Sequence, residues 1–201
     1  MTIIINLVGK SASGKNFHKS RFLYSSNENI LNFLKKHPVI RIVSTTTRAI
    51  RPGEVDGEDY YYISVEEHRR LRNERQIFEE FSLCTTKYSH CKSELKKLKS
   101  GGLGILETNP EGMRQIIKHL SGNGVKILSF GFDVDEETQR KRMKSRDTSI
   151  SEEENTTCIN VYKEFDEIFK EKDLFEHIYF NDEEKENFPV DLYNSVNDIF
   201  Q

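Results

Sequence analysis

A short apolar segment followed at once by a glycine-rich turn is the feature that most constrains the fold. Thr2 to Val8 are β-branched or apolar at nearly every position, which is typical of a strand buried on both faces of a parallel sheet. Directly after it comes Gly9-Lys10-Ser11-Ala12-Ser13-Gly14-Lys15-Asn16, which fits the spacing G-x-x-x-x-G-K. The alternative is an ordinary corner between a strand and a helix. The position of the turn, after an apolar strand and before a plausible helix, favours a loop whose backbone N–H groups face an anion.

A loop of this kind, the P-loop, holds nucleotide phosphates, and its lysine extends toward the terminal ones. Here that lysine is Lys15. The next position normally carries a hydroxyl that reaches Mg²⁺. In this chain it is Asn16, whose amide oxygen is also a ligand for a hard cation. We therefore predict that residues 9–16 bind ATP, with Asn16 beside the metal. Ala12 is a point of crowding if its position requires a positive φ.

A second motif contains two arginines, Arg48 and Arg51, three residues apart on a turn-rich segment that ends at Tyr60. An arginine presents a rigid fork of donors that never loses its charge, which suits the oxygens of a phosphate. Two such forks, with a phenol on the segment that follows, can surround one phosphate. From composition alone, the alternative is a solvated surface hairpin with charges of both signs.

The order of these residues resembles the acceptor-binding motif of guanylate kinases. The matching positions are Ser44, Arg48, Arg51, Gly53, Glu54, Gly57, Asp59 and Tyr60. The resemblance implies that Arg48, Arg51 and Tyr60 hold the phosphate of GMP. It also implies that Ser44 lies near the base. It extends over roughly residues 3–185 and so covers nearly the whole chain.

The same resemblance assigns the guanine base to later segments. Glu79 matches the acid that accepts the adjacent N1–H and N2–H₂ donors of guanine, which adenine does not offer. Tyr88 matches a phosphate-binding tyrosine. The position of the family's base-contacting hydroxyl is His90, or Ser89 with a slip of one residue. Asn109 replaces an Asp near the guanine amino group. Glu107 replaces a strand-end Asp near Mg²⁺ and keeps its charge.

Residues 140–146 form a basic run that ends at Arg146. Taken without any resemblance, such a run indicates a solvated helix face or a basic patch for nucleic acid. The resemblance instead implies that Arg142 and Arg146 line a lid over the ATP phosphates. It also implies that Asn181 lies beside the adenine. A further lid arginine of the family is missing, because the best overlay places Cys158 or a neighbour at its position.

The formal net charge of the 201 residues is −3, which gives no global basic field, so we expect no nucleic acid partner. The three cysteines include no C-x-x-C pair, which favours a reduced cytoplasmic protein. The apolar N-terminal segment lacks a basic region and a small-residue cleavage site. It is also short, so we expect neither a signal peptide nor a membrane span.

Strands and helices alternate along the chain, which predicts an α/β fold with a parallel sheet and helices on both faces. The expected strands are 2–8, 39–43, 77–83, 103–107, 124–132 and 178–182. The expected helices are 15–24, 28–36, 65–73, 91–100, 110–120, 133–144, 151–170 and 191–200. With the resemblance, this is a P-loop kinase core in one domain. Its parts would be the core (1–43, 91–140 and 166–201), an acceptor-binding region (44–90) and a helical lid (140–165).

The predicted reaction is phosphoryl transfer from MgATP to GMP or dGMP by a monomer or homodimer. The acceptor is already an anionic phosphate oxygen, so the reaction requires positioning and charge stabilisation rather than a general base. The residues predicted to act on the transferring group are Lys15, Arg48, Arg142 and Arg146. Two alternatives stay open. One is a kinase of the same fold acting on another nucleotide or a sugar phosphate. The other is a catalytically weak module that binds phosphorylated peptides.

Overall fold

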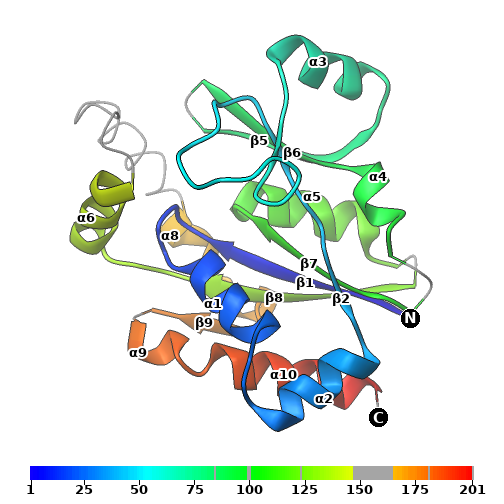
Figure 1. Ribbon diagram of the computed structural model, residues 1–201, viewed down its shortest axis with the longest axis vertical. Coiled ribbons are helices and arrows are strands. Elements are labelled where there is room, and N and C mark those ends of the chain that lie inside the picture. Colours follow the sequence, from blue (N-terminus) through cyan, green and yellow to red (C-terminus); the bar gives the residue numbers. More distant parts are fainter. Residues whose placement is uncertain (84, 99–100, 123, 147–164, 181, 201) are drawn as a thin grey trace.

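The computed structural model describes the chain except for residues 84, 99–100, 123, 147–164, 181 and 201, and two sheets organise the described part (Figure 1). The larger sheet has five strands in the order β2-β7-β1-β8-β9, all parallel. Its strands are β1 (Thr2–Gly9), β2 (Val39–Arg41), β7 (Leu103–Thr108), β8 (Val125–Phe132) and β9 (His177–Tyr179). The apolar N-terminal segment is the central strand, as predicted.

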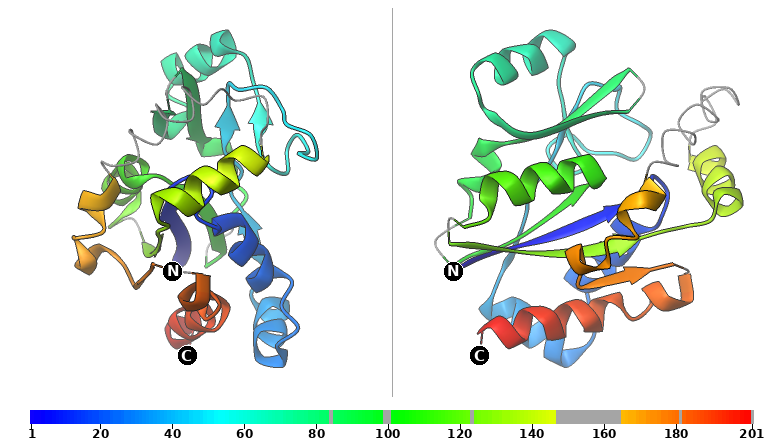
Figure 2. Two further views of the ribbon diagram at one scale, coloured as in Figure 1. Left: turned by 90° about the vertical axis from the view of Figure 1, so that its left-hand side faces the viewer. Right: turned by 180° about the vertical axis from the view of Figure 1, so that it is seen from behind.

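Helices cover both faces of this sheet (Figures 1 and 2). The helices on one face are α1 (Lys15–Leu23), α2 (Glu28–Lys36) and α10 (Phe188–Phe200). They pack on Ile3, Ile5 and Leu7, each fully buried. The other face carries α5 (Pro110–Leu120), which packs on Ile4, and α8 (Phe165–Ile168), whose Ile168 packs near Val8. Each buried aliphatic side chain stabilises the fold by about 1.5–3 kcal/mol. The predicted doubly covered sheet is confirmed.

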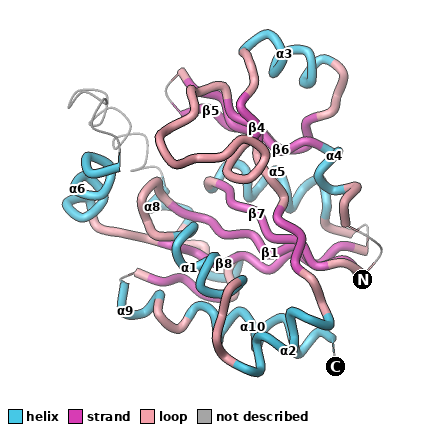
Figure 3. Tube along the Cα trace, viewed as in Figure 1, coloured by secondary structure: helices cyan, strands magenta, loops and turns pink. Residues whose placement is uncertain are grey.

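The smaller sheet has four strands in the order β4-β3-β6-β5 and lies above the first in Figure 3. Its strands are β3 (Thr45–Thr46), β4 (Tyr61–Tyr62), β5 (Ile77–Leu83) and β6 (Thr86–Cys91). The helix α3 (Val65–Asn73) lies between β4 and β5 in sequence, and Ser64 caps it through a 3.0 Å bond from Glu67 N to Ser64 Oγ. The sequence predicts β5 and α3, and a strand end near Ile63, where β4 lies. The strand β6 was missed because its polar sequence shows no clear alternation.

The helix expected at 91–100 is wrong in extent. Cys91 ends β6, and α4 spans only Lys92–Leu95. The chain then continues in tighter turns, with Lys97 N bonded to Glu94 O at 3.1 Å and Leu98 N to Leu95 O at 3.0 Å. Glu94 is turned inward, where its carboxylate accepts a 3.1 Å bond from Val43 N and ties α4 to the end of β2.

Two further helix starts differ from the expectation. The helix α6 (Glu136–Arg146) begins later than residue 133 because Asp135 accepts a 2.8 Å bond from Thr138 N and caps it. The helix α10 begins at Phe188 instead of residue 191. Most of the helix expected at 151–170 lies outside the described residues. The short elements η1 (Lys172–Leu174) and α9 (Asp182–Lys185) complete the fold. Among the described residues, no helix has the length and apolar character that crossing a membrane requires.

Candidate functional site

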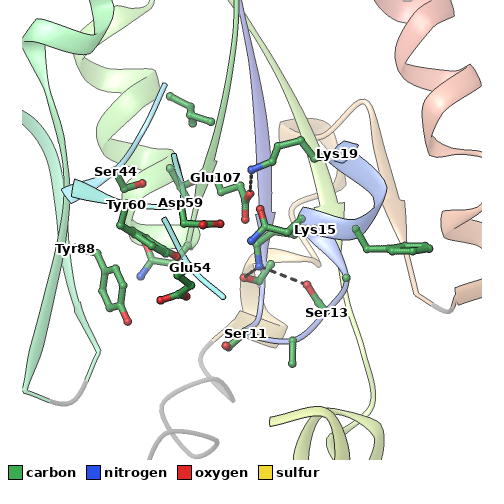
Figure 4. Close-up of a pocket in the computed structure, with 18 of the residues that line it drawn as sticks. Ser11, Ser13, Lys15, Lys19, Ser44, Glu54, Asp59, Tyr60, Tyr88 and Glu107 are labelled. Atoms are coloured by element: carbon green, nitrogen blue, oxygen red, sulfur yellow. Dashed lines mark hydrogen bonds and ion pairs between the residues drawn. The ribbon is translucent and has the colours of Figure 1, made fainter. Parts of the chain in front are cut away.

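A cleft of about 1480 Å³ lies where the carboxyl ends of the parallel strands face the smaller sheet. This edge is where open α/β sheets bind ligands. Figure 4 shows Ser44, Tyr60 and Tyr88 on one side of the cleft, and Lys15 and Lys19 on the other. The predicted site residues that line it are Gly9, Ser11, Ala12, Ser13, Gly14, Lys15, Asn16, Ser44, Arg48, Arg51, Tyr60, Tyr88, Glu107, Asn109 and Arg142. The P-loop and the arginine motif therefore share one cleft.

The P-loop has the backbone that its spacing predicts. Gly14 has φ 94° and caps the start of α1, so it adopts the left-handed conformation that glycine tolerates. A side chain at Gly9 would place its Cβ 2.2 Å from Phe132 O, because β1 and β8 approach closely there. Ala12 has φ 61°, so its position does require a positive φ, and the crowding considered from the sequence is present.

Lys15 lies folded back over the loop. Its Nζ donates to Gly9 O at 2.9 Å and to Lys10 O at 2.7 Å. Lys10, in turn, pairs with Asp133 at the end of β8, with 2.9 Å between Nζ and Oδ1. The ammonium of Lys15 is thus held by carbonyl oxygens at the start of the loop that the sequence predicts to bind phosphate.

Glu107 stands at the end of β7, between the two sides of the cleft (Figure 4). It forms an ion pair with Lys19, one turn of α1 after Lys15. Burial disfavours the charged carboxylate, but the ammonium groups of Lys19 and Lys15 outweigh it and hold the pKa of Glu107 below its ordinary value. Asn16 is exposed on the same cleft. Oxygen ligands for a hard cation are therefore present beside the P-loop.

The helix α6 contacts the P-loop through two side chains. Gln139 Nε2 donates to Ser11 O at 3.1 Å, and Arg142 Nη1 donates to Ala12 O at 3.3 Å. Arg142 also pairs with Asp182 of α9. The side chain of Arg146 and the whole of Asn181 lie outside the described residues, as does most of the predicted lid.

On the opposite side of the cleft, Arg48 is held by Glu54. The two side chains form a bidentate pair, with 2.7 Å from Nη1 to Oε2 and 2.6 Å from Nη2 to Oε1. Arg51 N and Tyr62 Oη also donate to Glu54 Oε2, at 2.9 Å and 2.7 Å. The guanidinium carbon of Arg48 lies 4.9 Å from the ring centroid of Tyr60. The arginine motif is therefore an ordered structure around one carboxylate.

These contacts shift the ionisation of the groups involved. Partial burial would raise the pKa of Glu54, but the hydrogen bonds from Arg48, Arg51 N and Tyr62 lower it to about 2. Burial and the hydrogen bond to Glu54 raise the pKa of Tyr62 to about 12. Burial opposes the charge of Arg48, but Glu54 more than compensates, so the pKa of Arg48 is above its ordinary value. Glu54 and Arg48 are both charged at neutral pH.

Glu79 and His90 do not line the cleft. Both side chains are buried, 0% and 1% exposed, and His90 Nδ1 lies 2.6 Å from Glu79 Oε2. His90 Nε2 lies 2.9 Å from the Oγ of Ser44, which does line the cleft. The structure therefore places Glu79 and His90 behind Ser44 rather than at the surface that a ligand meets.

The other oxygen of Glu79, Oε1, has no hydrogen-bond partner. It points at the first turn of α5, where a Cβ on Gly112 would lie 2.1 Å from it. Asn109 caps the same turn, since its Oδ1 accepts a 2.7 Å bond from Gly112 N. Gly112 is thus required for Glu79 to fit, and the predicted base-binding residues Glu79 and Asn109 lie on the two sides of one helix turn.

A family model described as guanylate kinase matches residues 2–183 of the chain. The guanylate kinase of Synechococcus sp. is 33% identical over 138 residues, which are 66% of this chain and 75% of that protein. The guanylate kinase of Novosphingobium aromaticivorans is 30% identical over 111 residues, which are 55% of this chain and 49% of that protein. That alignment spans about half the length of the Novosphingobium protein. The chain belongs to the guanylate kinase family.

Among solved structures, the guanylate kinase of Anaplasma phagocytophilum matches with a TM-score of 0.64 at 19% identity, covering 98% of this chain and 85% of that one. At this identity the likeness bears on the fold. The family and the α/β P-loop fold predicted from the sequence are both confirmed. Membership of the guanylate kinase family supports a nucleotide-binding, ATP-dependent kinase that converts GMP to GDP.

Three side chains of this guanylate kinase site had no predicted role. Lys19 lies four residues after Lys15, so the helical period alone places both on one face of α1. Glu54 is part of the arginine motif, and its position a few residues after Arg48 and Arg51 is a signal for pairing. Gln139 has no such signal, because its contact with the P-loop depends on how α6 packs.

Proposed function

We propose that this guanylate kinase transfers the terminal phosphoryl group of ATP to GMP in the single cleft described above. The observation that carries this proposal is the shared cleft, which contains the P-loop and the Arg48 motif on facing walls. Its volume of about 1480 Å³ exceeds the roughly 300–1,000 Å³ of a typical site for one small molecule. A donor and an acceptor nucleotide therefore have room to lie end to end, which an in-line transfer requires.

On the donor side, the backbone N–H groups of the P-loop and the start of α1 would bind the ATP phosphates. Lys15 would exchange its bonds to Gly9 O and Lys10 O for the terminal phosphate oxygens. Arg142, already in contact with the loop at Ala12 O, would neutralise the charge that spreads over the transferring group. We assign Arg146 to the same role and Asn181 to the adenine by resemblance alone.

On the acceptor side, the phosphate of GMP would draw on Arg48, which now pairs with Glu54. Arg48 and Arg51 would provide the charge, and Tyr60 and Tyr88 the hydroxyls. The rings of the two tyrosines lie 5.8 Å apart on the same wall. Arg48 Nε is buried without a hydrogen-bond partner, so this donor is not used by Glu54. Holding the acceptor oxygen in line is the main task, because no proton has to be removed from it.

The residues present fit a nucleotide-bound Mg²⁺. Such an ion takes one or two protein oxygens and completes its shell with phosphates and water. Glu107 and Asn16 would supply those oxygens. A cluster of three or more acidic, His or Cys ligands is absent from the described residues, and this mode of binding does not need one. When bound, the ion would offset the charge of the phosphates, while Lys19 fixes the orientation of Glu107.

The guanine base would lie between Ser44 and Asn109, which line the cleft. We keep the predicted roles of Glu79 and His90 as parts of the base site. Glu79 Oε1 supports this, because it is a buried acceptor without a partner and a donor from the ligand would satisfy it. Asn109 presents its amide beside the same helix turn.

We further propose a cytoplasmic enzyme that acts as a monomer or a homodimer.

Two other functions remain to be separated by experiment. His90 and Asn109 differ from the family pattern, which favours testing acceptors other than GMP. The phosphopeptide-binding module is disfavoured because Lys15, which such modules typically lack, is present and lies in the loop. Either function would use the arginine motif but would not give GDP.

The test is ADP release from ATP with each common nucleoside monophosphate as acceptor. We expect release to depend on GMP, and Lys15→Ala to lower kcat by orders of magnitude because the charge beside the transferring phosphate is lost. Lys36→Ala, at the exposed end of α2, is the matched control and should leave the rate unchanged. Equal rates for the parent and Lys15→Ala would refute the kinase. Binding of a phosphopeptide without ADP release would favour the module instead.

A further inference from the structure

A line of three side chains runs inward from the cleft wall: Ser44, His90 and Glu79. The distances are 2.9 Å from Ser44 Oγ to His90 Nε2 and 2.6 Å from His90 Nδ1 to Glu79 Oε2. The members come from the approach to β3, from β6 and from β5, and β3 and β5 both pair with β6. Only Ser44 lines the cleft. A ligand at this part of the wall therefore meets the hydroxyl of Ser44, and His90 stands directly behind that hydroxyl, held by Glu79 Oε2.

The chemistry of the three groups fixes where the protons lie when His90 is neutral. A carboxylate can only accept hydrogen bonds, so Nδ1 of His90 carries the hydrogen and donates to Glu79. Nε2 then has a free lone pair and accepts the hydroxyl proton of Ser44. With its own hydrogen directed inward, Ser44 presents only lone pairs to the cleft. In this state the cleft wall is a hydrogen-bond acceptor.

Protonation of His90 reverses the direction of its hydrogen bond with Ser44. Both ring nitrogens are then donors, and Nε2–H donates to Ser44 Oγ. The hydroxyl hydrogen of Ser44 is displaced from the ring and turns toward the cleft. The same residue now presents a donor. One proton on a buried imidazole thus changes the sign of the hydrogen bond that a base can make with Ser44.

We propose that His90 sets base selectivity by switching Ser44 between acceptor and donor, so that recognition of a 6-oxopurine is coupled to uptake of a proton by His90. This rests on the proposed function, which places a purine nucleotide in the cleft. The 6-oxo group of guanine needs a donor and is matched by protonated His90. A 6-amino group needs an acceptor and is matched by the neutral ring.

The surroundings of the ring leave Glu79 as its charged partner. Besides Ser44 and Glu79, the imidazole of His90 packs near the ring of Phe78, with 5.9 Å between the ring centroids. The other acidic groups on the elements packed against β6 are paired elsewhere: Glu80 of β5 with Arg72, and Glu94 of α4 with Lys97. The strand β3 brings no titratable side chain.

The remaining ionisable neighbours lie on β6 and α5. On β6, Lys87 is exposed and donates to Ser82. Tyr88 lies two positions before His90 and Cys91 one position after it. On α5, which packs against β5, Glu111 and Arg114 are exposed and Asn109 is neutral.

The probes are GMP and the ribonucleotide of 2,6-diaminopurine, which keeps the 2-amino group and replaces the 6-oxo group by an amino group. Both carry the same 5′-phosphate, so its titration cancels in the ratio of their dissociation constants. We expect the preference for GMP to rise by up to about tenfold for each unit by which the pH falls, over the range in which His90 takes up its proton. Calorimetry from about pH 5.5 to 8.5 measures this ratio.

His90→Gln is the decisive variant, since an amide can bridge Ser44 and Glu79 but does not titrate. We expect its ratio to be independent of pH. His68→Gln is the matched control: His68 is also buried, in α3, and lies 3.8 Å from Glu80 without lining the cleft. This control should keep the pH dependence of the parent.

A second measurement uses the parent protein alone, in case a His90 variant fails to fold. Calorimetry in two buffers of different ionisation enthalpy counts the protons taken up on binding. We expect uptake with GMP in excess of that with the diamino analogue. Binding of GMP with a ratio that is flat in pH, or with equal proton uptake for the two ligands, would overturn this inference and leave the kinase standing. Absence of binding by either nucleotide would overturn both.

Discussion

At the scale of single residues, Glu54 supplies the negative charge that the acceptor arginine contacts. Its pKa is about 2 in the folded chain, against 4.5 for a free glutamate. Because the folded state has the lower pKa, the stabilisation is complete above about pH 4.5 and is lost as the pH falls toward about 2. We predict that Glu54→Gln lowers the free energy of unfolding at neutral pH by at most about 3 kcal/mol. Urea unfolding of the parent and the variant at several pH values measures the difference.

The pH dependence separates this ion pair from a simple packing effect. The difference between the parent and Glu54→Gln should shrink steadily between pH 4.5 and pH 2, because protonation gives the parent the same uncharged group. Glu67→Gln is the control, since Glu67 pairs with Arg70 on the exposed face of α3, where solvent screens the attraction between the two charges. A difference for Glu54→Gln that stayed constant with pH would mean that shape, not charge, holds Arg48.

At the scale of elements, the backbone of the P-loop is strained at one residue, Ala12. Ala12 has φ 61°, a left-handed conformation that costs an alanine about 1–2 kcal/mol and a glycine very little. We predict that Ala12→Gly raises the free energy of unfolding by about 0.5–1 kcal/mol, part of the relief being offset by the greater freedom of glycine in the unfolded chain. Thermal unfolding measures it. Ala49→Gly, in the exposed loop of the arginine motif, is the control. A loss of stability in Ala12→Gly would show that the conformation is not strained.

Elements whose signals are local were predictable. The apolar run of residues predicts the strand β1. The pair Asn109-Pro110, a capping residue followed by a proline, predicts the start of α5. The strands β3 and β4 have two residues each and exist because of partners far along the chain, such as Thr45 beside Ser89. No periodicity reveals a strand of that length. The sequence therefore identifies the arginine motif as a site but not the sheet that supports it.

The sequence predicted which residues belong to the candidate site better than it predicted which of them are buried. Matching residues to the family motif selected Arg48, Tyr60 and Tyr88, and the structure brings all three to the cleft. The same matching gave no sign that Glu79 and His90 are buried behind Ser44, because the sequence of a strand does not say which of its faces a helix such as α5 covers. Their contact was also invisible, since it depends on the pairing of β5 with β6.

At the scale of the whole molecule, the cleft exists because two sheets with different roles meet at one edge. The parallel sheet supplies the P-loop and Glu107 at the carboxyl ends of its strands, and the smaller sheet supplies the arginine motif on the opposite wall. Neither sheet alone lines the whole cleft. Under the proposed function, the distance between the two nucleotides is set by how the sheets pack, and one ligand that spans both walls tests it.

We predict that adenosine and guanosine joined 5′ to 5′ by a phosphate chain bind about 10²- to 10⁴-fold tighter than either nucleotide alone, since the second half binds at high effective concentration. Arg48→Ala should remove about 1.5–3 kcal/mol of that affinity, as for a charge-assisted hydrogen bond, while leaving the affinity for ATP unchanged. Arg70→Ala, on the exposed face of α3 and outside the cleft, is the matched control and should have no effect. Calorimetry gives the dissociation constants. A joined ligand that binds no tighter than ATP and ignores Arg48→Ala would mean that the two walls do not act as one site.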